Sequence, residues 1–411
     1  MILVISTVLS FTMSSVNTLT RFAHLALMAF LVASHAAAAP VGLAPASAGA
    51  SLADHRGAIT GVLDLKALPG LDSIIPRLAR KRVVFIGEAH DQYGHHLNQL
   101  AIIRRLHARH PDLAIGMEFF QQPFQQELDD YIAGKLDERE LLKKTEYYKR
   151  WRFDFRLYAP ILRYARQHHI PVVALNLPME ITRQVGREGP DSLSESQKAQ
   201  IPAQIDRTDH VYRERLQNIY DSHPKRDGAN FDNFLEVQLL WDEGMAERAA
   251  QYLKQHPGRR LVVLAGSGHL AYGVGIPQRL TRRINVGTAI VLQGVEGSIE
   301  PDMADYLLLP EKHALPPPGR LGVVLANTDD GVRARAFSPG SAAAAAGIKR
   351  GDRILALDGV PVAENADIKV ALWDKRPGDT VAVEVRRRRW LRADATLAFE
   401  IELGEPAAAH H

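Results

Sequence analysis

The 411-residue chain contains no cysteine. This absence excludes disulfides, thiolate nucleophiles, cysteine-ligated iron–sulfur clusters and covalent attachment of a c-type haem. It also excludes acylation of an N-terminal cysteine, so we expect no lipid anchor. Any metal-dependent chemistry in this chain must therefore use other ligands.

Strong charge of either sign is also absent. The formal net charge is +3, and charged residues make up 24% of the chain. No basic stripe interleaved with aromatic residues occurs, so we expect no nucleic-acid partner. Apolar residues amount to 46%, which is enough for a sizeable core, and the length favours about two domains.

The N-terminal residues have the order of a secretory signal. Arg21 precedes an apolar run over 23–33, and four alanines follow at 36–39. The apolar run is too short to span a bilayer well. We predict a signal peptide over residues 1–39 and a periplasmic or other extracytoplasmic location. An uncleaved anchoring helix is the alternative, and it also implies export.

Residues 57–306 alternate between short apolar runs and helical patterns, which predicts an α/β domain with a mostly parallel sheet flanked by helices. Residues 123–166 have helical spacing, 179–257 form a helical lobe, and 230–255 within that lobe form one long helix. The runs that we expect to be buried strands are 83–86, 113–118, 170–175, 261–265 and 288–295.

Titratable side chains follow three of these strands. Glu88 and His90 follow the first, Glu118 ends the second, and His269 follows the fourth. Gly87 is expected to let the backbone turn as its strand ends. The carboxyl ends of parallel strands lie along one edge of a sheet, where open α/β sheets bind ligands. We therefore expect these side chains to converge.

Two chemistries suit this edge, and a polar cleft without a metal is a third interpretation. Imidazole and carboxylate groups fit zinc, manganese or another divalent metal held by His90, Glu118 and His269, with Glu88 or Glu118 as catalytic residues of a hydrolase. The same edge could instead seat a haem, since His, Tyr and Met remain available as axial ligands. The residues expected to contact a haem are His90, Tyr93, His95, His96 and Tyr272.

Five motifs resemble the ChaN-like haem-binding uptake family of the Tiki superfamily over about residues 57–295. They read GEAHDQYGHHLNQ, GMEFF, IPVVALNLP, FLEVQLLWDEGMA and LAGSGHLAYGVGIPQRL. The resemblance implies bacterial extracytoplasmic haem or iron uptake, and the Tiki relatives are implied to be metal-dependent peptidases. The family's GxxH histidines match His90 and His269, and its glutamate matches Glu118. Tyr93 and Tyr272 are chosen by proximity.

A proline-rich linker is predicted over 307–319, and a small β-rich domain over 320–404. The stretch 338–362 resembles a PDZ domain of the bacterial envelope type. Leu321, Gly322 and Val323 match its carboxylate-binding loop, where backbone N–H groups capture a peptide C-terminus. A degenerate module that acts only as a spacer is the alternative.

Together these patterns predict an exported haem- or iron-binding protein whose PDZ domain docks a peptide C-terminus or an envelope protein. A metal-dependent peptidase or hydrolase is the alternative. A scaffold protein whose site is inactive is a third interpretation. A homodimer is left open as an assembly state.

Overall fold

The computed structural model describes residues 64, 66–222, 230–294, 299–389 and 392–405. The predicted signal peptide and the first residues of the predicted α/β domain lie outside these ranges. Within the described residues, no helix has the length and apolar character needed to cross a membrane.

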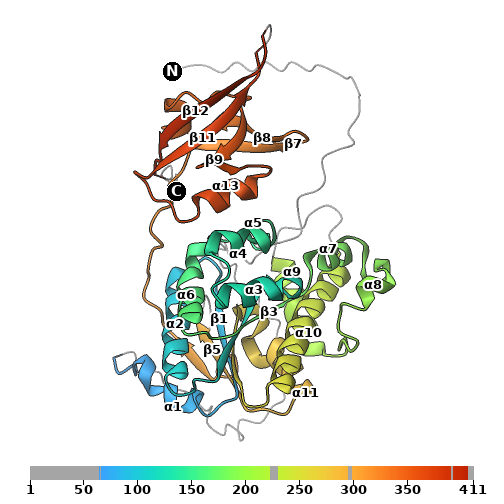
Figure 1. The fold of residues 1–411 in the computed structure, drawn as a ribbon. Helices are drawn as coiled ribbons and strands as arrows, with labels where there is room; N and C mark the ends of the chain where they lie inside the picture. The colour runs from blue at the N-terminus through green and yellow to red at the C-terminus, as the bar shows by residue number, and fades with distance from the viewer. Residues whose placement is uncertain (1–63, 65, 223–229, 295–298, 390–391, 406–411) are drawn as a thin grey trace, which may run out of the picture. The chain divides into compact units, whose positions relative to one another are not determined.

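A six-stranded parallel sheet forms the α/β domain, in the order β3-β2-β4-β1-β5-β6 (Figure 1). The predicted fold class is confirmed. The three-residue strand β6 was not predicted, and it takes the first two residues of the predicted linker. The strands are β1 (Val83–Glu88), β2 (Leu113–Gln121), β3 (Val172–Asn176), β4 (Arg260–Gly266), β5 (Thr288–Gln293) and β6 (Tyr306–Leu308).

Helices cover both faces of this sheet (Figure 1). The α-helices are α1 (Ile75–Leu78), α2 (Tyr93–His107), α3 (Gln125–Ile132), α4 (Glu138–Lys144), α5 (Tyr147–Arg150), α6 (Ala159–Gln167), α7 (Met179–Glu188), α8 (Glu195–Lys198), α9 (His210–Ser222), α10 (Phe231–Gln255) and α11 (Ile276–Arg283). The 3-10 turns are η1 (Leu71–Ser73), η2 (Gln122–Phe124), η3 (Phe155–Leu157), η4 (Pro190–Ser192), η5 (Ser267–His269) and η6 (Ala271–Gly273).

Strand β1 is apolar on both faces because it packs against two cores. Val84 and Ile86 belong to the core formed with α2, α3 and α6, whereas Val83 and Phe85 belong to the core formed with α10 and α11. A continuous apolar run is the pattern expected of a parallel strand buried on both sides. This burial fixes the end of β1 in the middle of the sheet.

The long helix α10 matches the helix predicted over 230–255. The Asn230 side chain accepts hydrogen bonds from the backbone N–H groups of Asp232 and Asn233, which caps the helix start. Its apolar stripe faces the sheet, yet Asp242 and Glu243 on α10 are also fully buried. Buried carboxylates need hydrogen-bond or ion-pair partners, and both of these carboxylates have such partners.

An antiparallel sheet in the order β12-β11-β9-β8-β7 forms the C-terminal domain, with β10 paired to β9. Strand β7 is at the edge of this sheet, and helix α13 contacts it. The elements are β7 (Val323–Thr328), β8 (Gly331–Phe337), α12 (Ala342–Ala345), β9 (Arg353–Leu357), β10 (Val360–Pro361), α13 (Asn365–Leu372), β11 (Thr380–Arg387) and β12 (Ala395–Glu402).

Candidate functional site

The carboxyl end of β1 carries Glu88 as its last residue, so Glu88 is in the strand and not in the turn. The expected role of Gly87 was wrong, because the strand continues through it. A Cβ atom at Gly87 would lie 2.6 Å from Leu292 Cδ2 and 2.8 Å from Ser267 Oγ. Glycine is needed here because neighbouring strands β5 and β4 approach closely at this point.

Glu88 is buried between two histidines. Its Oε1 accepts a hydrogen bond from His90 Nδ1 at 2.5 Å. His96 Nε2 is 2.9 Å from Glu88 Oε2 but is better aligned as a donor to the carbonyl of His90, at 3.1 Å. The contact between His96 and Glu88 is therefore mainly electrostatic.

Gln99 orients the second of these histidines. Its Nε2 donates to the carbonyl of Ile86, which leaves its Oε1 to accept from His96 Nδ1 at 3.1 Å. Burial alone would raise the pKa of Glu88, but the charges of His96 and His90 and the hydrogen bond from His90 lower it to about 2. Glu88 is thus a buried anion held by imidazole groups.

A second histidine–carboxylate pair faces the first across the sheet edge. His269 Nδ1 is 2.6 Å from Asp242 Oδ1, and the Tyr212 hydroxyl donates to Asp242 Oδ2 at 2.6 Å. Burial would lower the pKa of His269, but Asp242 and then Glu118 raise it to about 9. With Nδ1 engaged, His269 directs Nε2 toward Glu118 Oε1, 3.6 Å away.

Glu118 lies between the two pairs. Its Oε2 accepts a hydrogen bond from the backbone N–H of Gly266 at 2.8 Å. A Cβ atom at Gly266 would lie 2.9 Å from His90 Cε1, 3.3 Å from His90 Nε2 and 3.7 Å from Glu118 Oε2. Glycine at this strand end therefore lets the imidazole of His90 approach Glu118. We call Glu88, His90, Glu118, Asp242 and His269 the buried acid–histidine cluster.

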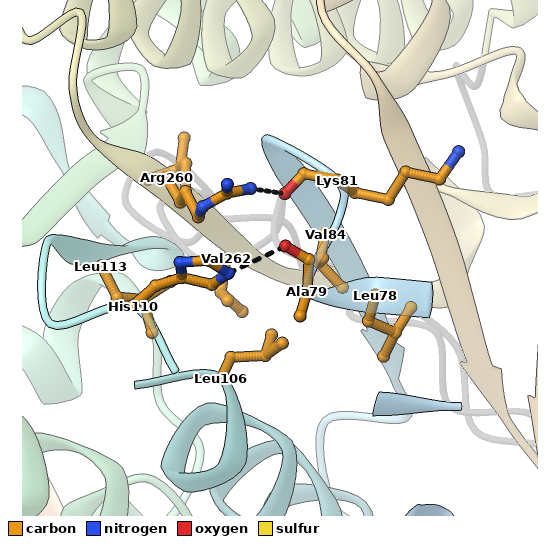
Figure 2. Close-up of a pocket in the computed structure, with 10 residues that line it drawn as sticks. Leu78, Ala79, Lys81, Val84, Leu106, His110, Leu113, Arg260 and Val262 are labelled. Carbon is orange, nitrogen blue, oxygen red and sulfur yellow. Dashed lines mark hydrogen bonds between the residues drawn. The ribbon is translucent and has the colours of Figure 1, made fainter. Parts of the chain in front are cut away.

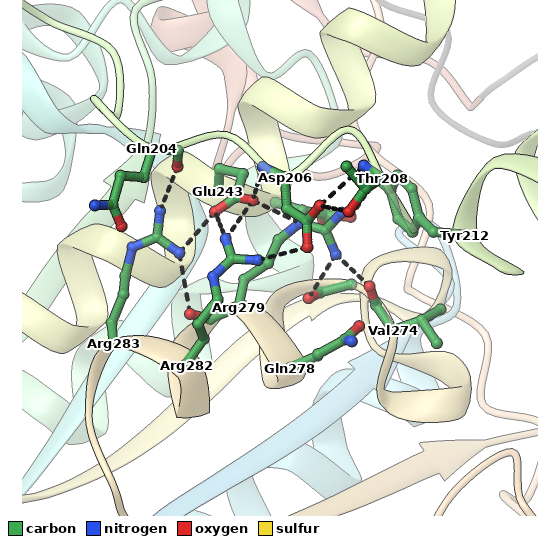
Figure 3. Close-up of polar contacts among 12 residues, drawn as sticks. Gln204, Asp206, Thr208, Tyr212, Glu243, Val274, Gln278, Arg279, Arg282 and Arg283 are labelled. Carbon is green, nitrogen blue, oxygen red and sulfur yellow. Dashed lines mark hydrogen bonds and ion pairs between the residues drawn. The ribbon is translucent and has the colours of Figure 1, made fainter. Parts of the chain in front are cut away.

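The Tyr212 ring that supports Asp242 is itself held by a buried arginine. The Arg279 guanidinium lies over this ring, 4.2 Å from its centroid, and pairs with Glu243. Figure 3 shows how Arg279, Arg282 and Arg283 of α11 surround Glu243 of α10. This group fixes α10 and α11 around His269.

Aromatic side chains line the other side of the cluster. Trp151 and Phe153 contact the His90 ring with centroid distances of 4.8 and 5.0 Å. Trp151 Nε1 donates to the Tyr158 hydroxyl, which donates to the carbonyl of His90. Phe119 packs against both Trp151 and Tyr158.

Three other predicted residues lie beside the cluster. His95 is buried, its Nδ1 accepts from the N–H of Ala89, and burial lowers its pKa, so it is a neutral imidazole near neutral pH. Tyr93 is half-buried at the start of α2. Tyr272 lies three residues after His269, and its hydroxyl donates to Glu300 at 3.0 Å.

Tyr272 has a strained backbone, with φ 61° and ψ 4°. A non-glycine residue in this region costs about 1–3 kcal/mol and often marks a functional site. The Arg215 guanidinium lies 5.4 Å from the centroid of its ring. Burial and the hydrogen bond to Glu300 raise the pKa of Tyr272, and Arg215 opposes this rise.

A divalent-metal site is not evident. Among the described residues, no group of three or more His or acidic side chains is arranged to hold a metal ion. His90 and His269 each bind a carboxylate through Nδ1, which leaves Nε2 available, and Glu118 accepts from the N–H of Gly266 through Oε2. The zinc or manganese alternative has no support among the described residues, because their side chains are not grouped as metal ligands.

A small cavity at the opposite end of the sheet is also excluded as a ligand site. It lies near the amino ends of β1, β2 and β4, and its volume is about 10 Å³. Figure 2 shows the hydrogen bonds from His110 to Ala79 and from Arg260 to Lys81 at its edge. This space is close to the minimum for one water molecule.

Four residues of this region were not predicted as site residues: Asp242, Tyr212, Trp151 and Phe153. Asp242 carried a usable signal, because a carboxylate beside an apolar helix stripe needs a buried partner. No such sequence signal marked Tyr212, Trp151 or Phe153, because their contacts join segments that are far apart in the sequence.

The predicted carboxylate-binding loop precedes β7 at the sheet edge. Among the described residues, the backbone N–H groups of Leu321 and Gly322 have no hydrogen-bond acceptor, whereas their carbonyls accept from Ala343 and Ser338. Gly322 has φ +70°, and a Cβ atom there would lie 2.8 Å from Ser341 Cα. The loop therefore requires glycine and presents two free donors.

The chain thus combines an α/β domain with a buried acid–histidine cluster at the strand ends and an antiparallel domain whose edge strand β7 follows a glycine-dependent loop. Residues 74–280 match the family model described as haem-binding uptake, Tiki superfamily, ChaN, and 319–403 match that of the PDZ domain. The chain belongs to the ChaN family of haem-binding uptake proteins, and it carries a PDZ domain.

The similar proteins and solved structures share low sequence identity with this chain. RETICULATA-RELATED 5, chloroplastic, of Arabidopsis thaliana is 26% identical over 261 residues, or 56% of this chain and 34% of that protein, so this chain spans about a third of its length. A solved structure of cofacial haem binding to ChaN of Campylobacter jejuni is 19% identical and covers 59% of this chain and 92% of its own (TM-score 0.49). The PDZ domain of a Vibrio cholerae carboxy-terminal protease, solved with a peptide, is 25% identical and covers 22% of this chain and 97% of its own (TM-score 0.20).

Proposed function

We propose that the α/β domain binds haem and takes part in haem or iron uptake, with Tyr272 as the axial ligand. Family membership supports haem as the ligand. The observation that favours Tyr272 is its strained backbone beside His269, with a hydroxyl bonded only to Glu300 among the described residues. Of the other residues predicted to contact haem, His90, His95 and His96 are buried and Tyr93 is half-buried.

The charged neighbour of Tyr272 suits an anionic ligand. Arg215 supplies a cation beside the Tyr272 ring, and Val274, two residues further on, is a half-buried apolar side chain. A tyrosine phenolate is an established axial ligand of haem iron. The buried acid–histidine cluster would hold His269, and so the start of the Tyr272 turn, in place.

Haemin titration tests this assignment. We expect the wild-type protein to give a shifted Soret band, and Tyr272→Phe to lose or displace it because the axial oxygen is removed. Tyr93→Phe is the matched control, since it removes a hydroxyl from the other predicted tyrosine. A Soret band in Tyr272→Phe identical to that of the wild type would refute the ligand assignment.

A hydrolase is the second candidate, because two imidazole groups oriented by carboxylates and aimed toward Glu118 are suited to proton transfer. Its signature differs from that of a carrier. If wild-type protein gives no Soret shift but cleaves peptides, and cleavage is lost in both His90→Ala and His269→Ala, the hydrolase replaces the haem carrier.

We further propose that the PDZ domain binds a peptide C-terminus. The two free N–H groups of Leu321 and Gly322 support this, since such groups capture carboxylates. The peptide would add as a strand to the open edge of β7, and half-buried Val323 and Leu325 would contact its side chains.

Gly322→Asp should weaken peptide affinity by about tenfold or more, which is about 1.4 kcal/mol. The substitution crowds the loop and places a negative charge where the peptide carboxylate binds. Gly340→Asp is the matched control, because Gly340 also has φ +70° but has open space where a Cβ atom would lie. The affinities of both variants are measured with a library of C-terminal peptides. Equal affinities of Gly322→Asp and Gly340→Asp would refute the assignment of the carboxylate-binding loop.

Finally, we propose export to an extracytoplasmic space with cleavage of the signal peptide. The order of Arg21, an apolar run and four alanines supports this. Mass spectrometry of the mature protein should give an N-terminus near Ala39. Recovery of a chain that still starts at Met1 or Met13 would contradict cleavage.

A further inference from the structure

The segment that covers His90 contains a backbone feature that packing alone does not require. Arg152, between the two aromatic residues that contact His90, has φ +76°, and Glu146, at the start of α5, has φ +49°. Arginine and glutamate gain nothing from this left-handed region, which costs about 1–2 kcal/mol per residue. Strain of this kind persists only where the surroundings impose it, and it clusters at active sites, ligand clamps and switch regions.

The first part of the segment is firmly anchored. Tyr147 and Tyr148 are buried, and Arg150 binds Gln121 at 2.8 Å and Glu180 at 2.9 Å. Exposing two tyrosines and breaking these contacts would be costly. Any movement of the segment must therefore start after Arg150.

The second part is held more weakly. Arg152 is exposed, and no hydrogen bond or ion pair of its side chain is present among the described residues. Phe153 is half-buried, whereas Trp151 is buried in the core and bonded to Tyr158, so Trp151 stays in place. These residues cover the His90 ring, which is only 9% exposed.

We propose that Phe153 is a gate that pivots at Arg152 and controls access of small molecules to His90. In the closed state its ring covers the imidazole beside Trp151, and in the open state the imidazole meets solvent. This inference concerns His90 and does not depend on haem binding at Tyr272. It makes the buried acid–histidine cluster a second, gated site for small polar reactants.

The test is ethoxycarbonylation of histidines with diethyl pyrocarbonate, with each modified histidine located by mass spectrometry. Phe153→Ala should raise the rate at His90 by about fivefold or more, because about 1 kcal/mol of closing contact corresponds to such a factor. Rates are compared at one pH, so the intrinsic reactivity of His90 cancels. Tyr158→Phe, which removes the hydrogen bond to Trp151, should raise the rate less.

His269 is the internal control, because it is buried in the same cluster but is not covered by the gate. Phe231→Ala is the matched variant, since Phe231 is a half-buried phenylalanine with no ring contact to His90. A rate increase confined to His90 and to Phe153→Ala and Tyr158→Phe supports the gate. An unchanged rate at His90, or an equal increase at His90 and His269, overturns it.

Discussion

Glu243→Gln is expected to lower the free energy of unfolding by about 3–5 kcal/mol, the range measured when one partner of a buried ion pair is removed. Glu243 is fully buried and faces three arginines. Arg282 contacts it at 2.6 Å, Arg283 at 2.6 Å and Arg279 at 3.3 Å, and the N–H of Asp206 donates to it at 2.9 Å. Without the carboxylate, the remaining arginine charges repel one another in a site with little water.

Chemical denaturation of the full chain measures this effect. Glu236→Gln is the matched control on the same helix, because Glu236 pairs with the half-exposed Arg207 at 2.6 Å. Surface pairs contribute about 0–1 kcal/mol, so this control should differ little from the wild type. A loss in Glu243→Gln no larger than that in Glu236→Gln would show that the arginines find other partners.

The sheet could be predicted because its strands are buried on both faces. Runs such as 83–86 and 261–265 are apolar without alternation, and each is followed by a polar turn, so the existence of these strands and their parallel direction could be predicted. Strand β6 could not be predicted, because its three half-buried residues show no periodicity and its formation depends on pairing with β5. The role of Gly87 also required the neighbouring strands to be placed.

The helical prediction over 123–166 was wrong for residues 151–154, and residues 155–157 form only the 3-10 turn η3 before α6 starts at Ala159. Trp151 and Phe153 have helical spacing relative to later apolar residues, but Arg152 adopts a left-handed conformation. No sequence pattern identifies such an arginine, because the conformation is imposed by contacts with His90 and Phe119. The covering of His90 therefore emerged only from the structure.

The ends of β1, β2 and β4 bring together residues that the sequence placed at strand ends, and the reason is topological. Parallel neighbours share a direction, so Glu88, Glu118 and Gly266 meet at one edge. The supporting residues come from α9 and α10, whose positions across the lobe depend on packing. The parts that Asp242 and Tyr212 play in the site could therefore not be predicted from the sequence.

Glu88→Gln is expected to remove about 3 kcal/mol of stability at pH 7, since the pKa of Glu88 falls from 4.5 to about 2 on folding and one unit corresponds to 1.36 kcal/mol. The sign follows from the direction of this shift. A carboxyl whose folded pKa is lowered stabilises the protein fully above its unfolded pKa and loses this contribution as the pH falls. The wild type should therefore lose stability between about pH 4.5 and 2.

The variant lacks this titration, so the two stability curves should differ most near pH 7 and converge near pH 2. Urea denaturation at a series of pH values measures both curves. Asp72→Asn is the control, because Asp72 also has a lowered pKa, caused mainly by its hydrogen bond with Arg105, but is exposed. Its curve should stay close to that of the wild type, as expected for a solvent-screened pair. A constant difference between Glu88→Gln and wild type at all pH values would mean that Glu88 acts through packing, and that His90 and His96 do not hold it as an anion.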